Sequence, residues 1–84
     1  MAEIDVSEQA ADWLRDAEPD VRDRIMTKLR SIEDFPDHYL KRLSGSPYYR
    51  LRVGDYRVII DWQREDEPET LFVRKIGHRR NVYD

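Results

Sequence analysis

The sequence predicts an α+β fold of two layers, in which an N-terminal strand and a helical hairpin pack on one face of an antiparallel β-sheet. Three observations predict it. Apolar residues recur at helical spacing in the first half, apolar and polar residues alternate in the second half, and the chain has only 84 residues. Because so short a chain buries a small core, we expect residues 1–84 to form a single domain with helices on one sheet face.

A short strand and two helices are expected in the first half. Residues 3–6 alternate between polar and apolar, which is typical of a strand. Ser7 then stands where a helix N-cap is expected, and an apolar stripe follows it as far as Ala17. The second helix is expected to begin at Pro19, which suits a first helical turn, and to end before Pro36, because the residue before a proline disfavours helix.

The second half begins with a predicted loop over residues 37–47, followed by a β-hairpin. Its strands are Tyr48–Val53 and Tyr56–Trp62, and the two residues Gly54-Asp55 join them. A glycine in the first turn position supplies the positive φ that such turns demand.

This turn sets the register of the hairpin, since Val53 must pair with Tyr56. One face is then wholly apolar or aromatic and should cover the helices: Tyr49, Leu51, Val53, Tyr56, Val58, Ile60 and Trp62. The other face receives Tyr48, Arg50, Arg52, Arg57, Ile59 and Asp61, with Arg52 directly opposite Arg57. Facing like charges destabilise a sheet by up to about 1 kcal/mol. Such violations tend to occur at functional sites, so we interpret this face as a binding surface; the alternative is a solvated face without a role.

A third strand is predicted over Thr70–Ile76, after an acidic loop, with Gly77 as its end. The tail that follows adds His78, Arg79, Arg80 and Tyr83. If this strand lies beside the second strand of the hairpin, the tail emerges near one end of the arginine-bearing face.

The charge is unevenly distributed along the chain. Residues 1–37 carry a net charge of −6 and residues 38–84 carry +3, for a total of −3. Arginine outnumbers lysine by 12 to 3, and its planar guanidinium suits bidentate contact with phosphate. A basic region on an acidic chain indicates a local phosphate site rather than general adhesion to polyanions.

Several classes of site are excluded by what the sequence lacks. It has no cysteine, which excludes disulfide scaffolds, cysteine zinc sites and thiolate catalysis. It has no metal-ligand spacing, no glycine-rich phosphate loop and no serine paired with a base, so we expect no metal and no cofactor. Without a signal peptide or an apolar stretch of about 20 residues, we expect a cytoplasmic protein that does not bind membranes.

The remaining polar residues suit phosphodiester chemistry, which needs cations to neutralise developing charge and groups that donate and accept a proton. Four arginines supply the cations: Arg50, Arg52, Arg57 and Arg79. His78 and Tyr83 are the candidates for proton transfer. A lone histidine in a tail is more often a surface or capping group, and Tyr83 could equally be a hydrophobic anchor. Since RNA brings its own nucleophile, the 2′-OH, no metal is required.

The strings YYRLRVGDYRVIIDW and VRKIGHRRNVY resemble the RelE branch of the RelE/ParE superfamily of type II toxins. The resemblance covers nearly the whole chain and implies the RelE-like fold. It also implies an endoribonuclease that needs no metal, an mRNA interferase that enters the ribosomal A site. There the 2′-OH attacks the adjacent phosphate and leaves a 2′,3′-cyclic phosphate and a 5′-OH.

The resemblance implies roles for individual residues. Arg57 would neutralise charge in the transition state, Arg79 would contact the leaving group or phosphate, and Tyr83 would stack on the base or aid proton transfer. Arg52 would act with these catalytic residues and also contact RNA. The other RNA-binding candidates are Tyr48, Arg50, His78 and Arg80.

The implied partners are the ribosome with its mRNA and a RelB-like antitoxin, which would build a heterotetramer with the toxin. An apolar antitoxin helix would lie on the exposed part of the helical stripe, where Trp13 and Met26 are candidates. Two alternatives stay open: a non-catalytic ParE-like toxin that blocks DNA gyrase, and a decayed toxin that only binds its antitoxin.

Overall fold

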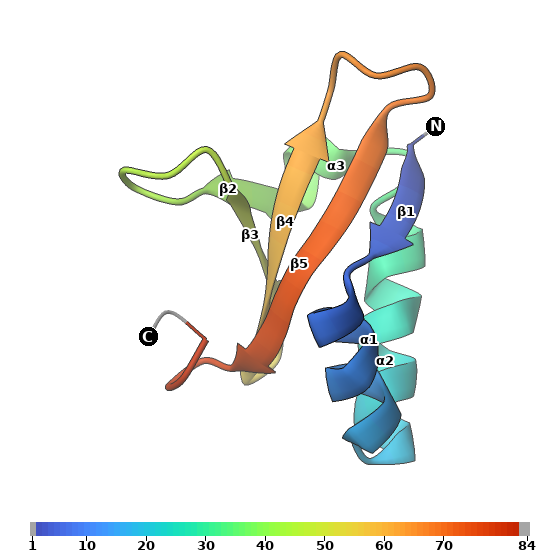
Figure 1. The fold of residues 1–84 in the computed structure, drawn as a ribbon, viewed down its shortest axis with the longest axis vertical. Helices are drawn as coiled ribbons and strands as arrows, with labels where there is room; N and C mark the ends of the chain where they lie inside the picture. The colour runs from blue at the N-terminus through green and yellow to red at the C-terminus, as the bar shows by residue number, and fades with distance from the viewer. Residues whose placement is uncertain (1, 83–84) are drawn as a thin grey trace.

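The structure, a computed structural model, describes residues 2–82. In chain order the elements are β1 (Glu3–Val6), α1 (Glu8–Asp16), α2 (Pro19–Ser31), α3 (Pro36–Tyr39), β2 (Leu40–Arg42), β3 (Tyr49–Val53), β4 (Tyr56–Gln63) and β5 (Thr70–His78). Helices α1 and α2 lie on one side of a five-stranded sheet (Figure 1), which confirms the predicted α+β class. No helix in the described part of the chain is long and apolar enough to cross a membrane.

The sheet has the strand order β1-β5-β4-β3-β2. Neighbouring strands are antiparallel except β1, which pairs in parallel with β5 from Glu3↔Thr70 to Val6↔Val73. The N-terminal strand is therefore an edge strand of the sheet itself. A parallel pair needs a long crossover, and the helices and the β2–β4 meander together supply it.

The two long helices begin as predicted. The Ser7 Oγ accepts a hydrogen bond from the Ala10 N–H at 3.1 Å and donates one to the Arg74 carbonyl at 2.7 Å, so the cap of α1 is also tied to β5. Helix α2 has Pro19 at its start and ends at Ser31, where the chain leaves the helix well before Pro36.

The predicted loop over residues 37–47 is wrong at its beginning, because the short helix α3 and the strand β2 occupy residues 36–42. Elements of three or four residues are too short to show a periodic pattern of apolar side chains. Leu40 is nevertheless buried and pairs with Leu51, so β2 extends the sheet beyond β3.

The hairpin of β3 and β4 has the predicted register, with Val53 opposite Tyr56 and Arg52 opposite Arg57. Gly54 has a φ of +58° and Asp55 is not in the positive-φ region, the pattern of a type II′ turn. The predicted apolar face is confirmed, because its side chains pack with the helices in one buried cluster. The fully buried members of that cluster are Ala10, Ile25, Leu29, Ile32, Leu51, Val58, Ile60, Leu71 and Val73.

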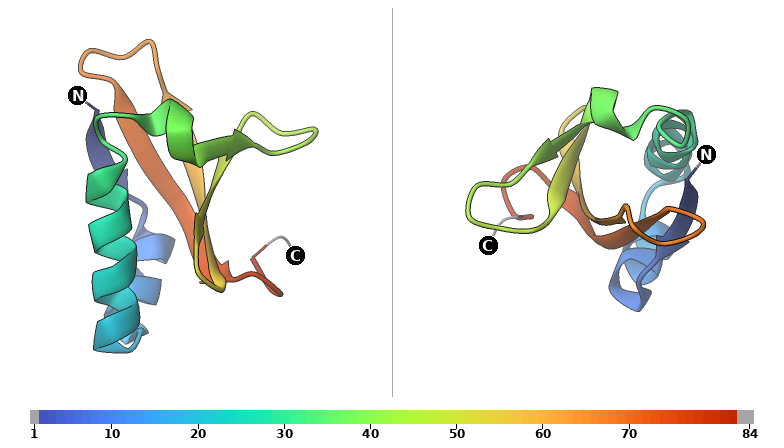
Figure 2. Two further views of the ribbon diagram at one scale, coloured as in Figure 1. Left: turned by 180° about the vertical axis from the view of Figure 1, so that it is seen from behind. Right: turned by 90° about the horizontal axis from the view of Figure 1, so that it is seen from above.

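Strand β5 runs two residues past the expected end at Ile76 and includes Gly77, which pairs with Arg57. The chain then turns back over the sheet face opposite the helices (Figure 2). Val82 is 3% exposed, and its Cβ lies 3.4 Å from the place where a Cβ on Gly77 would stand. The absence of a side chain at Gly77 thus makes room for the tail.

Candidate functional site

The sheet face turned away from the helices carries the cationic residues. We call it the arginine face; its members are Tyr48, Arg50, Arg52, Arg57, Arg74 and Lys75. Arg50, Ile59 and Lys75 form one row across three strands, and Arg52, Arg57 and Gly77 form the next row. The register therefore gathers cations from three strands onto one face, which Asp61 of β4 shares at its other end.

Arg57 is the buried member of this face, with only 7% of its surface exposed. Its Nη1 donates hydrogen bonds to the carbonyl oxygens of Gly54 at 2.7 Å and Tyr56 at 2.8 Å. The guanidinium is thus folded against the β3–β4 turn, while Arg52 opposite it is exposed to solvent. This arrangement separates two charges that the register places face to face.

Arg79 lies at the same turn as Arg57. Its backbone N–H donates to the Asp55 carbonyl at 2.8 Å, and its Nε is 3.9 Å from the Asp55 Oδ1. The Arg79 side chain is 48% exposed. The prediction that the tail emerges beside the hairpin is confirmed, and Arg57 and Arg79 both contact the two-residue turn.

The other predicted residues of the tail are arranged differently. The His78 ring packs against Tyr56, with 5.8 Å between ring centroids, on the helix side of the sheet rather than with the arginine face. Its Nδ1 accepts a hydrogen bond from the N–H of Arg80, whose side chain is exposed. Tyr83 lies outside the described residues.

Arg74 is a residue of the arginine face that the sequence pattern did not reveal. The β4–β5 register shifts between Ile59 and Ile60, so Arg74 is an extra residue in β5. Its guanidinium carbon lies 4.4 Å from the centre of the Tyr48 ring, a cation–π contact across the sheet. A β-bulge changes which face a residue occupies, and strict alternation cannot anticipate it.

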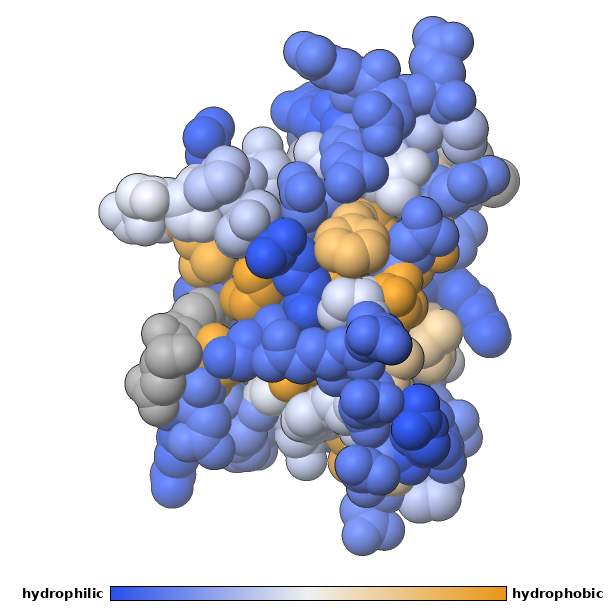
Figure 3. All heavy atoms as spheres, viewed as in Figure 1, coloured by the Kyte–Doolittle hydropathy of each residue, from blue (hydrophilic) through white to orange (hydrophobic). Residues whose placement is uncertain are grey.

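A hollow of about 300 Å³ lies between the arginine face and the tail. Its lining residues are Gln9, Leu43, Tyr48, Ile59, Arg74, Lys75 and Val82. The surface seen in Figure 3 is mostly hydrophilic, with several hydrophobic areas spread across its middle. Among the residues that line the hollow, Leu43, Ile59 and Val82 are apolar. An apolar floor with cations at its margin suits a ligand that has both an aromatic and an anionic part.

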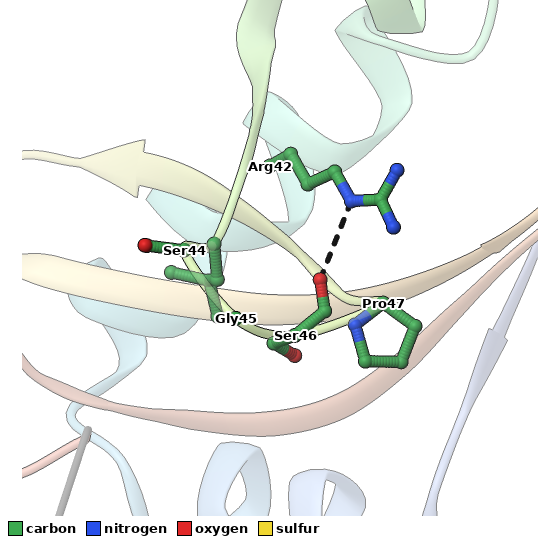
Figure 4. Close-up of a pocket in the computed structure, with 6 residues that line it drawn as sticks. Arg42, Ser44, Gly45, Ser46 and Pro47 are labelled. Carbon is green, nitrogen blue, oxygen red and sulfur yellow. Dashed lines mark hydrogen bonds between the residues drawn. The ribbon is translucent and has the colours of Figure 1, made fainter.

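The β2–β3 loop, residues 43–48, borders this hollow and curls around an open depression of its own (Figure 4). Arg42 Nε donates to the Ser46 carbonyl at 3.3 Å, and the Tyr48 N–H donates to the Ser46 Oγ at 3.1 Å. These two hydrogen bonds hold the loop next to Tyr48. Among residues 2–82, no group of three or more histidine or acidic side chains is placed to hold a metal ion.

Comparison with known proteins identifies a family for this fold and surface. Residues 4–83 match the model of the ParE toxin of the type II toxin–antitoxin system parDE. Toxin RelE3 of Methanocaldococcus jannaschii is 39% identical over 46 residues, which cover 54% of this chain and 48% of that protein. The match thus spans about half the length of the curated relative.

Two solved structures are similar over almost the whole chain. The archaeal RelE–RelB complex from Pyrococcus horikoshii OT3 contains a chain that superposes with a TM-score of 0.77 at 22% identity, covering 96% of this chain and 98% of that one. A chain of the intact E. coli RelBE toxin–antitoxin complex superposes with a TM-score of 0.72 at 28% identity, covering 93% and 96%. The likeness to the Pyrococcus chain shows the fold. The E. coli chain has the same fold and a higher sequence identity to this chain.

These comparisons agree on one kind of protein, a type II toxin: the family model matches residues 4–83, and the relative and the solved structures are RelE toxins. The chain belongs to the ParE toxin family of type II toxin–antitoxin systems and is a RelE-like member of the RelE/ParE superfamily.

Proposed function

We propose that this toxin is an endoribonuclease that cleaves mRNA in the ribosomal A site and that a RelB-like antitoxin neutralises it. The observation that supports this best is the arginine face, which gathers Arg50, Arg52, Arg57 and Arg74 on one side of the sheet with Arg79 at its end. A row of guanidinium groups suits the phosphate chain of RNA, which guanidinium binds with two parallel hydrogen bonds.

The nucleophile of the proposed reaction is the 2′-OH of the RNA itself. The 2′-oxygen of a nucleotide forms a bond to the adjacent phosphorus as the bond from phosphorus to the 5′-oxygen breaks. The 2′-OH loses its proton, and the 5′-oxygen gains one. The products are a 2′,3′-cyclic phosphate and a 5′-OH, and negative charge builds up on the phosphoryl oxygens in the transition state.

We assign the stabilisation of this charge to Arg57 and Arg79. The two carbonyl hydrogen bonds hold the Arg57 guanidinium in one place, and fixed cations in a partly dry site stabilise a transition state better than mobile ones. Arg79 is exposed enough to reach the leaving group. Arg50 and Arg52 would hold the neighbouring phosphates, and Tyr48 would stack on a base.

Arginine does not lose its proton, so the arginine face supplies charge and not a general base. The resemblance gives proton transfer to Tyr83, and this role stays a prediction. The RNA-binding roles of Arg80 and His78 also stay predictions; the place of the His78 ring beside Tyr56 favours a structural role for it instead.

A ParE-like toxin that blocks DNA gyrase is the second candidate, because the matching family model is that of the ParE toxin. Such a toxin acts by contact with a protein and would not require the arginine face. A decayed toxin that only binds its antitoxin is a third.

One pair of assays separates these functions. In a purified translation system the wild-type protein should stop synthesis, and the Arg79→Ala variant should not, because it lacks a cation at the reacting phosphate. Arg30→Ala, which removes an exposed charge from α2, should act like wild type. Inhibition of gyrase supercoiling without any effect on translation would contradict the proposal and support the ParE-like function.

The partner is proposed from the solved relatives, which include complexes of RelE with RelB. We propose that a RelB-like antitoxin binds this chain in a heterotetramer in the cytoplasm. Trp13 and Met26, which are half-buried and pack against the core, are the predicted contacts for an antitoxin helix.

A further inference from the structure

A second cationic surface lies on the opposite side of β3 from the tail, between that strand and α2. This α2–β3 groove has a volume of about 350 Å³, and its lining residues are Arg24, Thr27, Lys28, Ser31, Arg52, Val53 and Gly54. None of these residues is acidic. The groove therefore combines three cations with two hydroxyl groups on a chain whose net charge is −3.

Helix geometry explains why the polar residues of α2 line one groove. Arg24, Thr27, Lys28 and Ser31 recur at spacings of three and four, so they share one face of the helix. The groove is lined by that face of α2 and by residues 52–54 at the β3–β4 turn; α2 runs towards α3 at its C-terminal end (Figure 2). At the turn, the Nη1 of Arg24 is 3.6 Å from the place where a Cβ on Gly54 would stand.

The groove joins the arginine face at this turn. Arg52 lines the groove and also lies opposite Arg57, and the Gly54 carbonyl accepts a hydrogen bond from Arg57. A polyanion on the arginine face can thus continue into the groove through Arg52, past Asp55 of the turn, whose Oδ1 lies 3.9 Å from the Nε of Arg79. None of the residues that line the groove itself is acidic.

The other end of the groove meets an exposed aromatic cluster of Phe35, His38 and Tyr39. Phe35 is 64% exposed and Tyr39 is 42% exposed; they are the large hydrophobic residues that residues 2–82 leave exposed. Each of these two rings contacts the ring of His38, with centroid distances of 6.2 Å for Phe35 and 6.1 Å for Tyr39. Lys28 connects the two surfaces, since its Nζ lies 4.2 Å from the centre of the Tyr39 ring.

We propose that the α2–β3 groove and this aromatic cluster form a second binding surface for single-stranded RNA, which meets the arginine face at Arg52. Proteins that bind single strands combine a cationic groove for the phosphate chain with exposed aromatic rings on which bases stack. Arg24 and Lys28 would contact phosphates, the hydroxyl group of Thr27 would add a hydrogen bond, and Phe35 would stack on a base. The Ser31 hydroxyl donates to the Lys28 carbonyl at 2.7 Å.

The groove fits RNA better than the antitoxin helix. An antitoxin helix buries apolar side chains, whereas the face of α2 that lines the groove is polar throughout and the aromatic rings lie only at its end. The inference shares one premise with the proposed function, namely that this chain binds RNA.

The test measures binding of a fluorescent single-stranded RNA of about 12 nucleotides, with 2′-O-methyl groups that prevent cleavage, across a range of salt concentrations. The double variant Arg24→Ala/Lys28→Ala should bind at least about tenfold more weakly, and its slope of log K against log salt should be about 1.4 shallower, because two phosphate contacts are lost. Phe35→Ala should weaken binding by about fivefold or more with an unchanged slope, because stacking releases no counterions.

The matched control is Arg30→Ala, which removes a charge from another face of α2 and should leave both affinity and slope unchanged. A DNA strand of the same sequence distinguishes RNA binding from general binding of polyanions. Equal affinities for the double variant and the control would overturn the inference. A double variant that binds RNA normally but no longer binds a purified antitoxin would also overturn the inference.

This experiment can fail independently of the proposed function. If the wild-type protein cleaves mRNA on ribosomes while the groove variants bind RNA normally, the inference is wrong and the proposed function stands. If the groove variants lose RNA binding while the wild-type protein cleaves nothing, the proposed function is wrong and the inference about the groove stands.

Discussion

Arg57 is a charged side chain that is buried on one face of the sheet and bonded to backbone carbonyl oxygens. The register places it opposite Arg52, and the structure relieves the repulsion by turning Arg57 onto the carbonyl oxygens of Gly54 and Tyr56. Each guanidinium hydrogen bond then contributes to the stability of the turn as well as to the placing of the charge.

Replacing Arg57 should therefore cost stability as well as activity. Arg57→Ala removes two charge-assisted hydrogen bonds from a buried site, and we expect it to lower the free energy of unfolding by about 1.5–3 kcal/mol. Urea unfolding followed by circular dichroism measures this loss.

Arg52→Ala is the matched control, because Arg52 is exposed and faces a like charge. It should leave stability unchanged or raise it by up to about 1 kcal/mol. If Arg57→Ala unfolds at the same urea concentration as wild type, Arg57 does not hold the turn.

Gly54 is a residue of the same turn whose backbone conformation limits substitution. Its φ of +58° is in the left-handed region, where a side chain costs about 1–2 kcal/mol. Gly54→Ala should lower the melting temperature, and Gly54→Asn should lower it less, because asparagine tolerates this region better. Equal melting temperatures for the three proteins would show that the turn relaxes to another conformation.

At the scale of elements, the long helices and the hairpin could be predicted because each carries a strong local signal. Ser7 and Pro19 mark helix starts, and Gly54 marks a turn. The parallel pairing of β1 with β5 could not be predicted, since it joins segments more than 60 residues apart with no local signal. The strand β2 was missed because three residues are too few for a pattern.

Ser7 couples two elements, and its removal should affect both. Its hydroxyl caps α1 through the Ala10 N–H and also donates to the Arg74 carbonyl in β5. Ser7→Ala should therefore cost about 1–2 kcal/mol of unfolding free energy in chemical denaturation. Ser44→Ala, on the exposed β2–β3 loop, should cost less than about 0.5 kcal/mol. A similar loss in both variants would contradict the capping role.

For the whole molecule, the sequence predicted the fold class and the hairpin surface more completely than the site. The positions of Arg50, Arg52 and Arg57 on one face follow from strand alternation and a two-residue turn, which are local rules. The burial of Arg57, the bulge that brings Arg74 onto Tyr48 and the return of Val82 over Gly77 depend on how distant segments pack. Such features require the three-dimensional structure.

Residues 79–82 follow β5 and cover the arginine face at one end. Val82 is buried and contacts the position of Gly77, so a larger side chain there would displace it. Gly77→Val should lower the free energy of unfolding by about 1–3 kcal/mol, because overpacking forces the tail or the strand to move. Nuclear magnetic resonance shifts confined to the tail and to the turn at Asp55 would locate the change; unchanged shifts there would contradict the packing.

The most direct test of the proposed function is to map the cut that the purified protein makes in ribosome-bound mRNA, with wild type and Arg79→Ala compared. We predict cleavage in the A site that leaves a 2′,3′-cyclic phosphate and a 5′-OH. We expect the folded Arg79→Ala variant to cleave at least about a hundredfold more slowly, since it lacks a cation at the developing charge. No cleavage by folded wild-type protein, or equal cleavage by Arg79→Ala, would contradict the account.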